Sequence, residues 1–207
     1  MSESPRRLIL ASASQGRREL LEEAGLEFEV RVAPPGAEEA ALEAAMKAGA
    51  APEALAQAAA RGKAEAVARS AAAGEVVLAA DTLVRATDGE VLGKGSNAEE
   101  SRAILRKLSG TTHHVISGVT VIVAGTGERH DWVHSSAVHL AEMSEAEIEA
   151  YVGSGRSVGA SGGYRIQRKG TDRYLTVVSG SLSNVVGLPM EEIIPLLARM
   201  GVEPREN

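Results

Sequence analysis

The hydrophobic and polar positions at the start of the chain predict a strand, then a helix, then a second strand. A short apolar run at residues 7–11 indicates a buried strand, and the helical pattern of residues 17–24 can end at Gly25. Apolar and charged side chains then alternate over residues 26–32, which is typical of a half-buried strand.

Alanine dominates the next segment, residues 37–73, and glutamate, lysine and arginine are scattered through it. Such a composition favours helix, and Gly49 and Pro52 divide the segment into two predicted helices. The run VVLAADTLV at residues 76–84 is almost wholly apolar, so it predicts a central strand that carries one acid.

The second half of the chain alternates between hairpin signals and helix signals. We predict a turn at residues 87–89 and strands at 113–124, 129–141, 164–167 and 173–179. One helix is predicted from the Asn97 cap to Leu108, and another begins at the Ser144 capping box. A last helix begins at Leu188-Pro189, and Pro195 should kink or shorten it. This mixture predicts an α/β fold with antiparallel hairpins in the second half.

Composition narrows the function classes. Of the 207 residues 44% are hydrophobic, which is enough for a core, but only 2% are aromatic, so Ala, Val, Leu and Ile must build that core. Few aromatic residues and a net charge of -6 argue against a nucleic-acid surface. Without cysteine there is no disulfide or thiolate chemistry. No apolar run approaches the roughly 20 residues that span a bilayer, so we expect a soluble cytoplasmic protein without nucleic-acid or membrane partners.

The stretch LASASQGRRELL, residues 10–21, places two adjacent cations where the first strand passes into the first helix. Backbone N–H groups at a helix N-terminus bind anions, and the forked guanidinium groups of Arg17 and Arg18 suit phosphate. Cations are unfavourable in a first helical turn, so their position after Ser12 and Ser14 indicates an anion nearby. The alternative is a solvated basic patch on an ordinary helix.

Asp81 interrupts the apolar run at residues 76–84. A carboxylate is costly to bury unless it is paired or binds a metal. At the carboxyl end of a strand it could hold a divalent metal or position a water. Alternatively, it is a strand-end aspartate whose oxygens are satisfied by the backbone.

Two glycine-rich stretches carry weaker signals. Lys94 lies between Gly93 and Gly95, where the backbone can approach a ligand closely, and Gln167 ends the run SGGYRIQ, where an amide could read the edge of a base. Either stretch could equally be an ordinary surface turn or loop. The five histidines lack metal-binding spacing, and we interpret them as structural or solvated.

Taken in order, these stretches resemble the Maf family of nucleoside triphosphate pyrophosphatases. The resemblance covers about residues 7–200 and rests on LASASQGRRELL, Glu38-Glu39, ARGKAEAVA around Lys63, AADTLV, LGKG, AILRKLSGTTHHVISGV, YVGSG, GGYRIQRKG and SGSLSNVVGLP. It implies a single Maf-like domain over residues 1–207. Its mixed twisted sheet would be flanked by helices, with two lobes around a nucleotide-binding cleft, as in inosine triphosphatases. The family is cytoplasmic and often forms homodimers.

The resemblance also implies an activity, the hydrolysis of a nucleoside triphosphate to a nucleoside monophosphate and pyrophosphate with Mg²⁺ or Mn²⁺. Asp81 would accept a proton from the attacking water and hold the metal together with Glu38, although Glu39 is only one register step away. The expected catalytic residues are Asp81, Glu38, Lys63 and Lys94. The expected substrate-binding residues are Ser12, Ser14, Gly16, Arg17, Arg18, Thr82 and Gln167.

Only a few of these residues indicate which nucleobase the substrate carries. Thr82 and Gln167 match the family's dTTP/UTP branch, but Gln15-Gly16 stands where that branch has Pro-Arg. Gly16 also replaces the tryptophan of the 7-methyl-GTP branch, which could stack on a cationic base. The remaining departures from the family pattern are Gly95, Ala160, Arg165 and Arg168. We therefore expect dTTP/UTP or a modified pyrimidine nucleotide. The alternatives are 7-methyl-GTP, or a low-turnover nucleotide-binding regulator linked to cell division.

Overall fold

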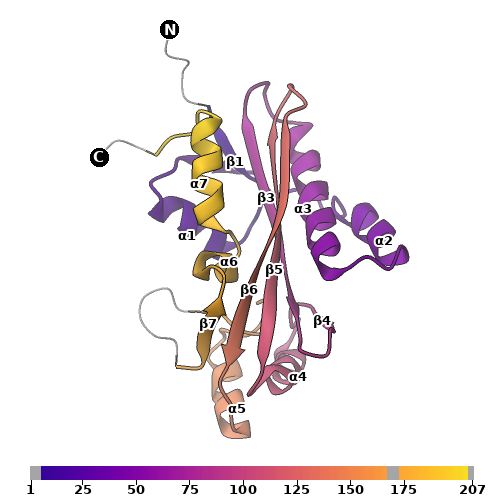
Figure 1. Cartoon of the computed structure of the whole chain (residues 1–207), viewed down its shortest axis with the longest axis vertical. Helices are drawn as coiled ribbons and strands as arrows, with labels where there is room; N and C mark the ends of the chain where they lie inside the picture. Colours follow the sequence, from indigo (N-terminus) through magenta and orange to yellow (C-terminus); the bar gives the residue numbers. More distant parts are fainter. Residues whose placement is uncertain (1–5, 167–172, 205–207) are drawn as a thin grey trace. The chain divides into compact units, whose positions relative to one another are not determined.

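The computed structural model describes residues 6–166 and 173–204, and Figure 1 labels its helices and strands. The chain forms two compact units. Unit 1 comprises Met1–Asp81, Ser117–His134 and Gly187–Asn207, and unit 2 comprises Thr82–Ile116 and Ser135–Val186. The chain therefore passes from unit 1 into unit 2 directly after Asp81.

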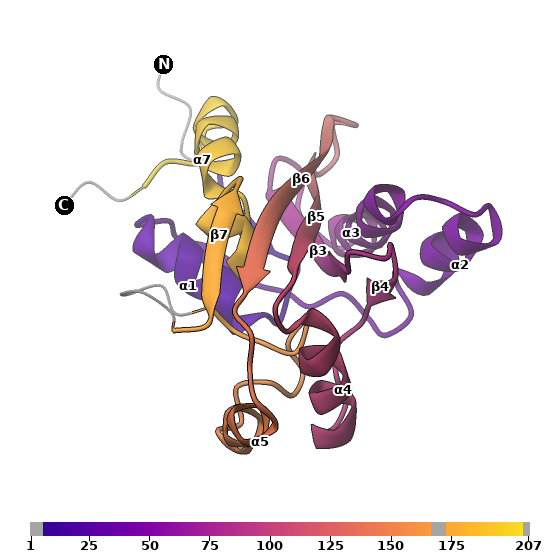
Figure 2. The same cartoon turned by 60° about the horizontal axis from the view of Figure 1, so that its bottom comes forward.

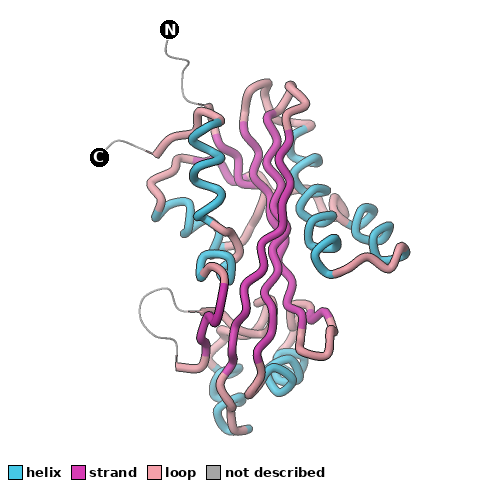
Figure 3. The backbone as a smooth tube through the Cα atoms, in the orientation of Figure 1, coloured by secondary structure: helices cyan, strands magenta, loops and turns pink. Residues whose placement is uncertain are grey.

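The described residues form a mixed sheet of seven strands in the order β2-β1-β3-β5-β6-β7, and β4 also pairs with β3. β1 is parallel to both of its neighbours, whereas the β3–β4 and β6–β7 pairs are antiparallel. The three longest strands are continuous (Figure 3). The strands are Leu8–Leu10 (β1), Phe28–Val30 (β2), Val76–Arg85 (β3), Val91–Leu92 (β4), Thr112–Val123 (β5), Arg129–Leu140 (β6) and Leu175–Ser179 (β7). The predicted α/β class, a mixed sheet with helices beside it, is confirmed.

Helices cover both sides of the strands in unit 1. Figures 1 and 2 both show α1 and α7 on one side of these strands and α3 on the other. The helices of the described part of this unit are Gln15–Glu23 (α1), Glu39–Lys47 (α2), Pro52–Ala68 (α3) and Met190–Arg199 (α7). Ala64 and Val67 of α3 pack on Ile9, Val77 and Ala79 of the strands. These small side chains let the helix lie close to the sheet, as the low aromatic content requires.

The position of α3 is fixed by a close backbone contact and by a polar cluster. A Cβ atom at Gly118 of β5 would lie 2.4 Å from backbone atoms of Ala56 and Gln57, so only glycine permits this approach. Asp131 of β6 adds the polar cluster. Its carboxylate accepts hydrogen bonds from Gln57 at 3.2 Å, Arg61 at 3.0 Å and Thr120 at 2.7 Å, and it pairs with Arg129 at 2.9 Å.

Unit 2 contains α4 (Ala98–Leu108), α5 (Glu145–Gly153) and α6 (Leu182–Val186) among its described residues. Arg102 pairs with Glu149, and Arg106 pairs with Glu145, so two ion pairs join α4 to α5. Asn97 caps α4 and Ser144 forms a capping box with Glu147 at α5, as the sequence predicts. Figure 2 shows both helices near the ends of the strands in this unit.

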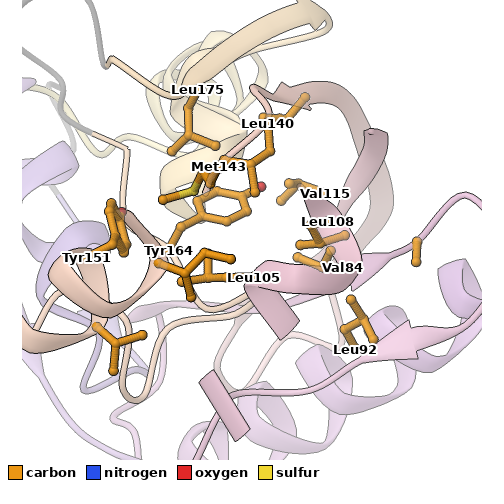
Figure 4. Close-up of a cluster of buried hydrophobic side chains, with 14 residues drawn as sticks. Val84, Leu92, Leu105, Leu108, Val115, Leu140, Met143, Tyr151, Tyr164 and Leu175 are labelled. Carbon is orange, nitrogen blue, oxygen red and sulfur yellow. The ribbon is translucent and has the colours of Figure 1, made fainter. Parts of the chain in front are cut away.

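The core of unit 2 encloses a neutral polar pair. Figure 4 shows the Tyr164 ring close to Leu105 and Met143, within a cluster of buried apolar side chains. The Tyr164 hydroxyl lies 2.6 Å from His113 Nε2. Burial, assisted by the charges of His114 and His139, lowers the pKa of His113 to about 4, and burial also raises the pKa of Tyr164. The pair is therefore uncharged near neutral pH.

Several predicted boundaries were wrong. The helix predicted from residue 17 begins at Gln15, because the Ser14 side chain caps it and accepts from the Arg17 amide. The strand predicted over 26–32 is reduced to β2, which is three residues long. β2 lies at the outer edge of the sheet order, with Val30 and Val32 exposed, so alternation overestimated both its length and its burial.

The later loop also differs from its prediction. Residues 164–166 do not form a strand, and residue 167 lies outside the described residues. Gly162 and Gly163 have φ values of 72° and 69°, which turn the chain and direct Tyr164 into the core. The helix α7 continues through Pro195 and is not shortened by it. Among the described residues, we find no helix whose length and hydrophobicity would allow it to cross a membrane.

Candidate active site

Lys63 lies between two carboxylates in unit 1. Its Nζ atom is 2.7 Å from Asp81 Oδ1 and 3.4 Å from Glu38 Oε1. The side chains of Lys63, Asp81 and Glu38 are 18%, 19% and 32% exposed, so this charged group is half-buried but open to solvent. One cation thus faces two anions, and the group carries a net negative charge.

Three elements bring these side chains together. Asp81 follows residues 76–80 of β3, which are all buried, and it is the first residue of the strand that is partly exposed. Lys63 projects from α3, and Glu38 directly precedes α2. The neighbouring Glu39 is exposed and is the first residue of α2, so the residue that pairs with Lys63 is Glu38. Among the described residues, Lys63 is the hydrogen-bond donor to Asp81.

The turn between β1 and α1 holds a second cation. Arg17 is only 8% exposed, and it donates to Ser12 Oγ at 2.9 Å and to the Gly187 carbonyl at 3.0 Å. Ser12 Oγ also accepts from the Ser14 amide at 3.2 Å, which fixes the start of the helix. Burial lowers the pKa of Arg17, while the negative charge of Asp81 acts in the opposite direction. The electrostatic influence of Asp81 therefore reaches this guanidinium.

The two adjacent arginines have different surroundings. Arg17 is buried and bonded to the turn, whereas Arg18 is exposed and lines a surface hollow with Glu22 and Phe28. Gly16 is half-buried in the first turn of α1. The structure thus brings Ser12, Ser14 and Arg17 together but places the Arg18 side chain elsewhere.

Two further predicted residues, Thr82 and Lys94, belong to unit 2. Lys94 forms an isolated antiparallel bridge with Ser161, and the Ser161 hydroxyl donates to the Thr82 carbonyl at 3.0 Å. Thr82, Lys94 and the glycine-rich loop are therefore linked through one serine. Gln167 lies outside the described residues.

Comparison with known proteins identifies the family. Residues 7–200 match the family model described as "Maf: Maf-like protein". The chain belongs to the Maf family.

Curated relatives in the Maf family carry one activity in their names. A protein of Anaeromyxobacter dehalogenans named dTTP/UTP pyrophosphatase is 45% identical over 94% of this chain and 94% of its own length. A Thermus thermophilus protein with the same name is 44% identical over 95% of this chain and 96% of its own. A solved structure of a HAM1 protein from Coxiella burnetii shares 14% identity with a TM-score of 0.40, over 67% of this chain and 74% of that one.

Two glycines beside these residues escaped the sequence analysis. Gly62 precedes Lys63 inside α3, where an alanine-rich helix gives no reason for glycine, and that mismatch was the available signal. Gly187 has a φ of 130°, and a Cβ atom there would lie 3.1 Å from Arg17 Nε. Its lack of a side chain therefore makes room for the buried guanidinium.

The site offers few metal ligands of its own. Within residues 6–166 and 173–204, no three His, Asp or Glu side chains are grouped so that they could hold a metal ion. Glu38 and Asp81 form a pair of carboxylates that face the same ammonium group. Mg²⁺ is commonly bound by one or two carboxylates, with substrate phosphates and water completing the shell. The pair therefore fits Mg²⁺ or Mn²⁺, with water and phosphate oxygens as the remaining ligands.

Proposed function

We propose that this Maf protein hydrolyses dTTP and UTP to the nucleoside monophosphate and pyrophosphate. The observation that carries the proposal is the pairing of Asp81 and Glu38 with Lys63 in a chain whose curated relatives are named dTTP/UTP pyrophosphatases. An anionic substrate requires cations, and hydrolysis requires a proton acceptor beside them. This group of residues contains both.

Asp81 is the proton acceptor in this proposal. The oxygen of a water molecule bonds to the α-phosphorus while the bond from that phosphorus to the α–β bridging oxygen breaks. Pyrophosphate leaves with the electron pair, and the water gives a proton to the Asp81 carboxylate. Asp81 suits the role because Lys63 occupies one of its oxygens and leaves acceptor positions for a water.

Lys63 and Arg17 supply positive charge from unit 1. A triphosphate carries up to about four negative charges, and phosphoryl transfer depends mainly on positioning and charge neutralisation. The α1 N-terminus, with Ser12 and Ser14 at its start, adds backbone N–H groups that favour a phosphate. We also assign Lys94 to the triphosphate, on the motif that it matches. Arg18 matches a family position beside the triphosphate, but its exposed side chain lines the hollow with Glu22 and Phe28, so we give it no contact with the phosphates.

Glu38 and Asp81 would hold the divalent metal, Mg²⁺ or Mn²⁺. When bound, such a metal neutralises developing charge on the phosphates. Lys63 lies between the same carboxylates, so it would shift toward the substrate or share them with the metal.

The pyrimidine preference rests on Thr82 and Gln167, which match the dTTP/UTP branch, and on the names of the relatives. Gly16 departs from that branch, and it leaves the first turn of α1 without the side chain that the branch has there. We therefore expect a modified pyrimidine to be accepted as well. We expect the protein to act on these nucleotides in the cytoplasm.

The test is pyrophosphate release from a panel of dTTP, UTP, 5-methyl-UTP, CTP, GTP and 7-methyl-GTP with Mg²⁺ or Mn²⁺. We expect turnover of dTTP, UTP and 5-methyl-UTP to exceed that of the purine nucleotides by at least about tenfold. A preference for 7-methyl-GTP would replace the proposal with its alternative. Binding of nucleotides without turnover would identify a regulator instead of an enzyme.

A further inference from the structure

Gly62 occupies an unfavourable position for a glycine. It lies within α3, which runs from Pro52 to Ala68 and is rich in alanine. A glycine inside a helix costs about 1 kcal/mol relative to alanine. The residue directly precedes Lys63, so the cost falls beside the central cation of the site.

The close approach of another segment explains the glycine. A Cβ atom at position 62 would lie 2.8 Å from the Ala37 carbonyl oxygen and 2.9 Å from Glu38 Cα. Both are backbone atoms, so no rotation of a side chain could relieve the overlap. The lack of a side chain at Gly62 is what lets residues 37–38 rest on α3.

The helix is not free to move away. On another side, Gly118 brings β5 against the backbone of Ala56 and Gln57, and Asp131 bonds to Arg61 of the same helix. A methyl group at position 62 would therefore displace residues 37–38 and leave α3 in place. Lys63 and Asp81, held by α3 and β3, would keep their 2.7 Å contact, whereas the 3.4 Å contact from Lys63 to Glu38 would lengthen.

We propose that Gly62 is a positioning residue that sets the Glu38 carboxylate beside Asp81 and thereby determines the divalent-metal affinity of this centre. This inference rests on the proposed function, since it takes Glu38 and Asp81 as the metal ligands. Residues that orient metal ligands typically alter metal affinity by about 10- to 100-fold when they are changed.

The experiment compares Gly62→Ala with Gly153→Ala in the full chain. Gly153 is the last residue of α5, and a Cβ atom there would meet nothing within 4 Å, so this variant adds the same methyl group harmlessly. Mn²⁺ alone is titrated into each protein, and free Mn²⁺ is measured by electron paramagnetic resonance. We expect Gly62→Ala to weaken Mn²⁺ binding about tenfold and Gly153→Ala to change it less than twofold.

Repeating the substitution in the Glu38→Gln variant separates an effect on the position of Glu38 from a general disturbance of the fold. In Glu38→Gln the carboxylate is already gone, so adding Gly62→Ala should weaken Mn²⁺ binding no further. An equal loss in both backgrounds, unchanged binding in Gly62→Ala, or a wild-type protein that binds no Mn²⁺ would each overturn the inference. Pyrophosphate release, measured on the same samples, reports on the proposed function separately: wild-type Mn²⁺ binding without turnover would leave the inference standing and remove the function.

Discussion

Asp81 and Asp131 are two carboxylates of unit 1 that look alike by exposure and charge. Each side chain is 19% exposed, and each pairs with a cation of α3: Asp81 with Lys63 and Asp131 with Arg61. Their surroundings differ. Gln57, Arg61, Thr120 and Arg129 all contact Asp131, whereas Lys63 is the donor that the described residues offer Asp81.

The difference lies in how many acceptor positions remain. An ionised carboxylate has about four lone-pair sites, and the partners of Asp131 fill them all. That acid fastens α3 to the sheet. Asp81 retains positions for a water or a metal, and Glu38 lies on the other side of the same lysine. Asp131 is therefore a structural acid, because donors fill its acceptor positions, whereas Asp81 can still accept a proton or bind a metal.

Exchanging each acid for its amide should give opposite results. We expect Asp81→Asn to lower turnover about 10³-fold, the scale of general-base catalysis, and to change the free energy of unfolding by less than about 1 kcal/mol. Asp131→Asn turns two acceptor positions into an NH₂ group that faces donors, so it should cost about 2–4 kcal/mol of stability with turnover kept within a few fold. Urea denaturation and pyrophosphate release measure the two quantities. If Asp81→Asn and Asp131→Asn lost turnover and stability to the same extent, the distinction between a catalytic and a structural acid would be contradicted.

Lys63 and Arg61, the cations that pair with these two acids, should differ in the same way but with smaller effects. Lys63→Met leaves two facing carboxylates without the ion that they share, so we expect turnover to fall about 10²-fold. Arg61→Met leaves Asp131 with its other three partners and should cost only about 1 kcal/mol of stability. Both substitutions lie on α3 and have similar size, so helix propensity does not explain a difference. Loss of turnover in Arg61→Met at full stability would show that the site extends to this residue.

The His113–Tyr164 pair extends the comparison to a site without charge. Because the pKa of His113 falls from an ordinary 6.5 to about 4 on folding, the unfolded chain binds a proton in this range that the folded protein does not. The contribution of the neutral His113 to the free energy of unfolding is therefore fully present above about pH 6.5 and is lost as the pH falls toward 4. Between pH 7 and 5 the loss amounts to about 2 kcal/mol.

The matched variants for this pH effect are His113→Gln and His130→Gln. His130 is 42% exposed, so His130→Gln controls for the loss of an imidazole at the surface. His113→Gln should flatten the pH dependence of urea denaturation between pH 5 and 7, even if it lowers stability overall. An unaltered slope in His113→Gln would mean that another group causes the acid sensitivity.

The sequence was most informative where one side chain contradicted its surroundings. Asp81 was found because an acid interrupts an apolar strand, and α2 and α3 followed from composition, Gly49 and Pro52. Asp131 gave no such signal, since it lies in a strand with many polar residues. Its role depends on Gln57, which is 74 residues away in the sequence, and on Thr120 of the neighbouring strand β5.

Local patterns also failed where tertiary contacts decide. Nothing in the adjacent pair Arg17-Arg18 indicates that one is buried and the other exposed, because Gly187 provides the space for Arg17 from far along the chain. The alternating residues around β2 suggested a longer strand, but among the described strands β2 lies at the edge and pairs only with β1. Gly62 likewise acquires its meaning only from the distant segment that rests on it.

The most direct test of this account is ³¹P NMR of dTTP incubated with Mg²⁺ and the wild-type protein, Asp81→Asn or Asp131→Asn at a temperature where all three are folded. We expect dTMP and pyrophosphate in equal amounts from wild type and from Asp131→Asn, and unchanged dTTP with Asp81→Asn. Formation of dTDP and orthophosphate, or undiminished turnover by Asp81→Asn, would contradict it.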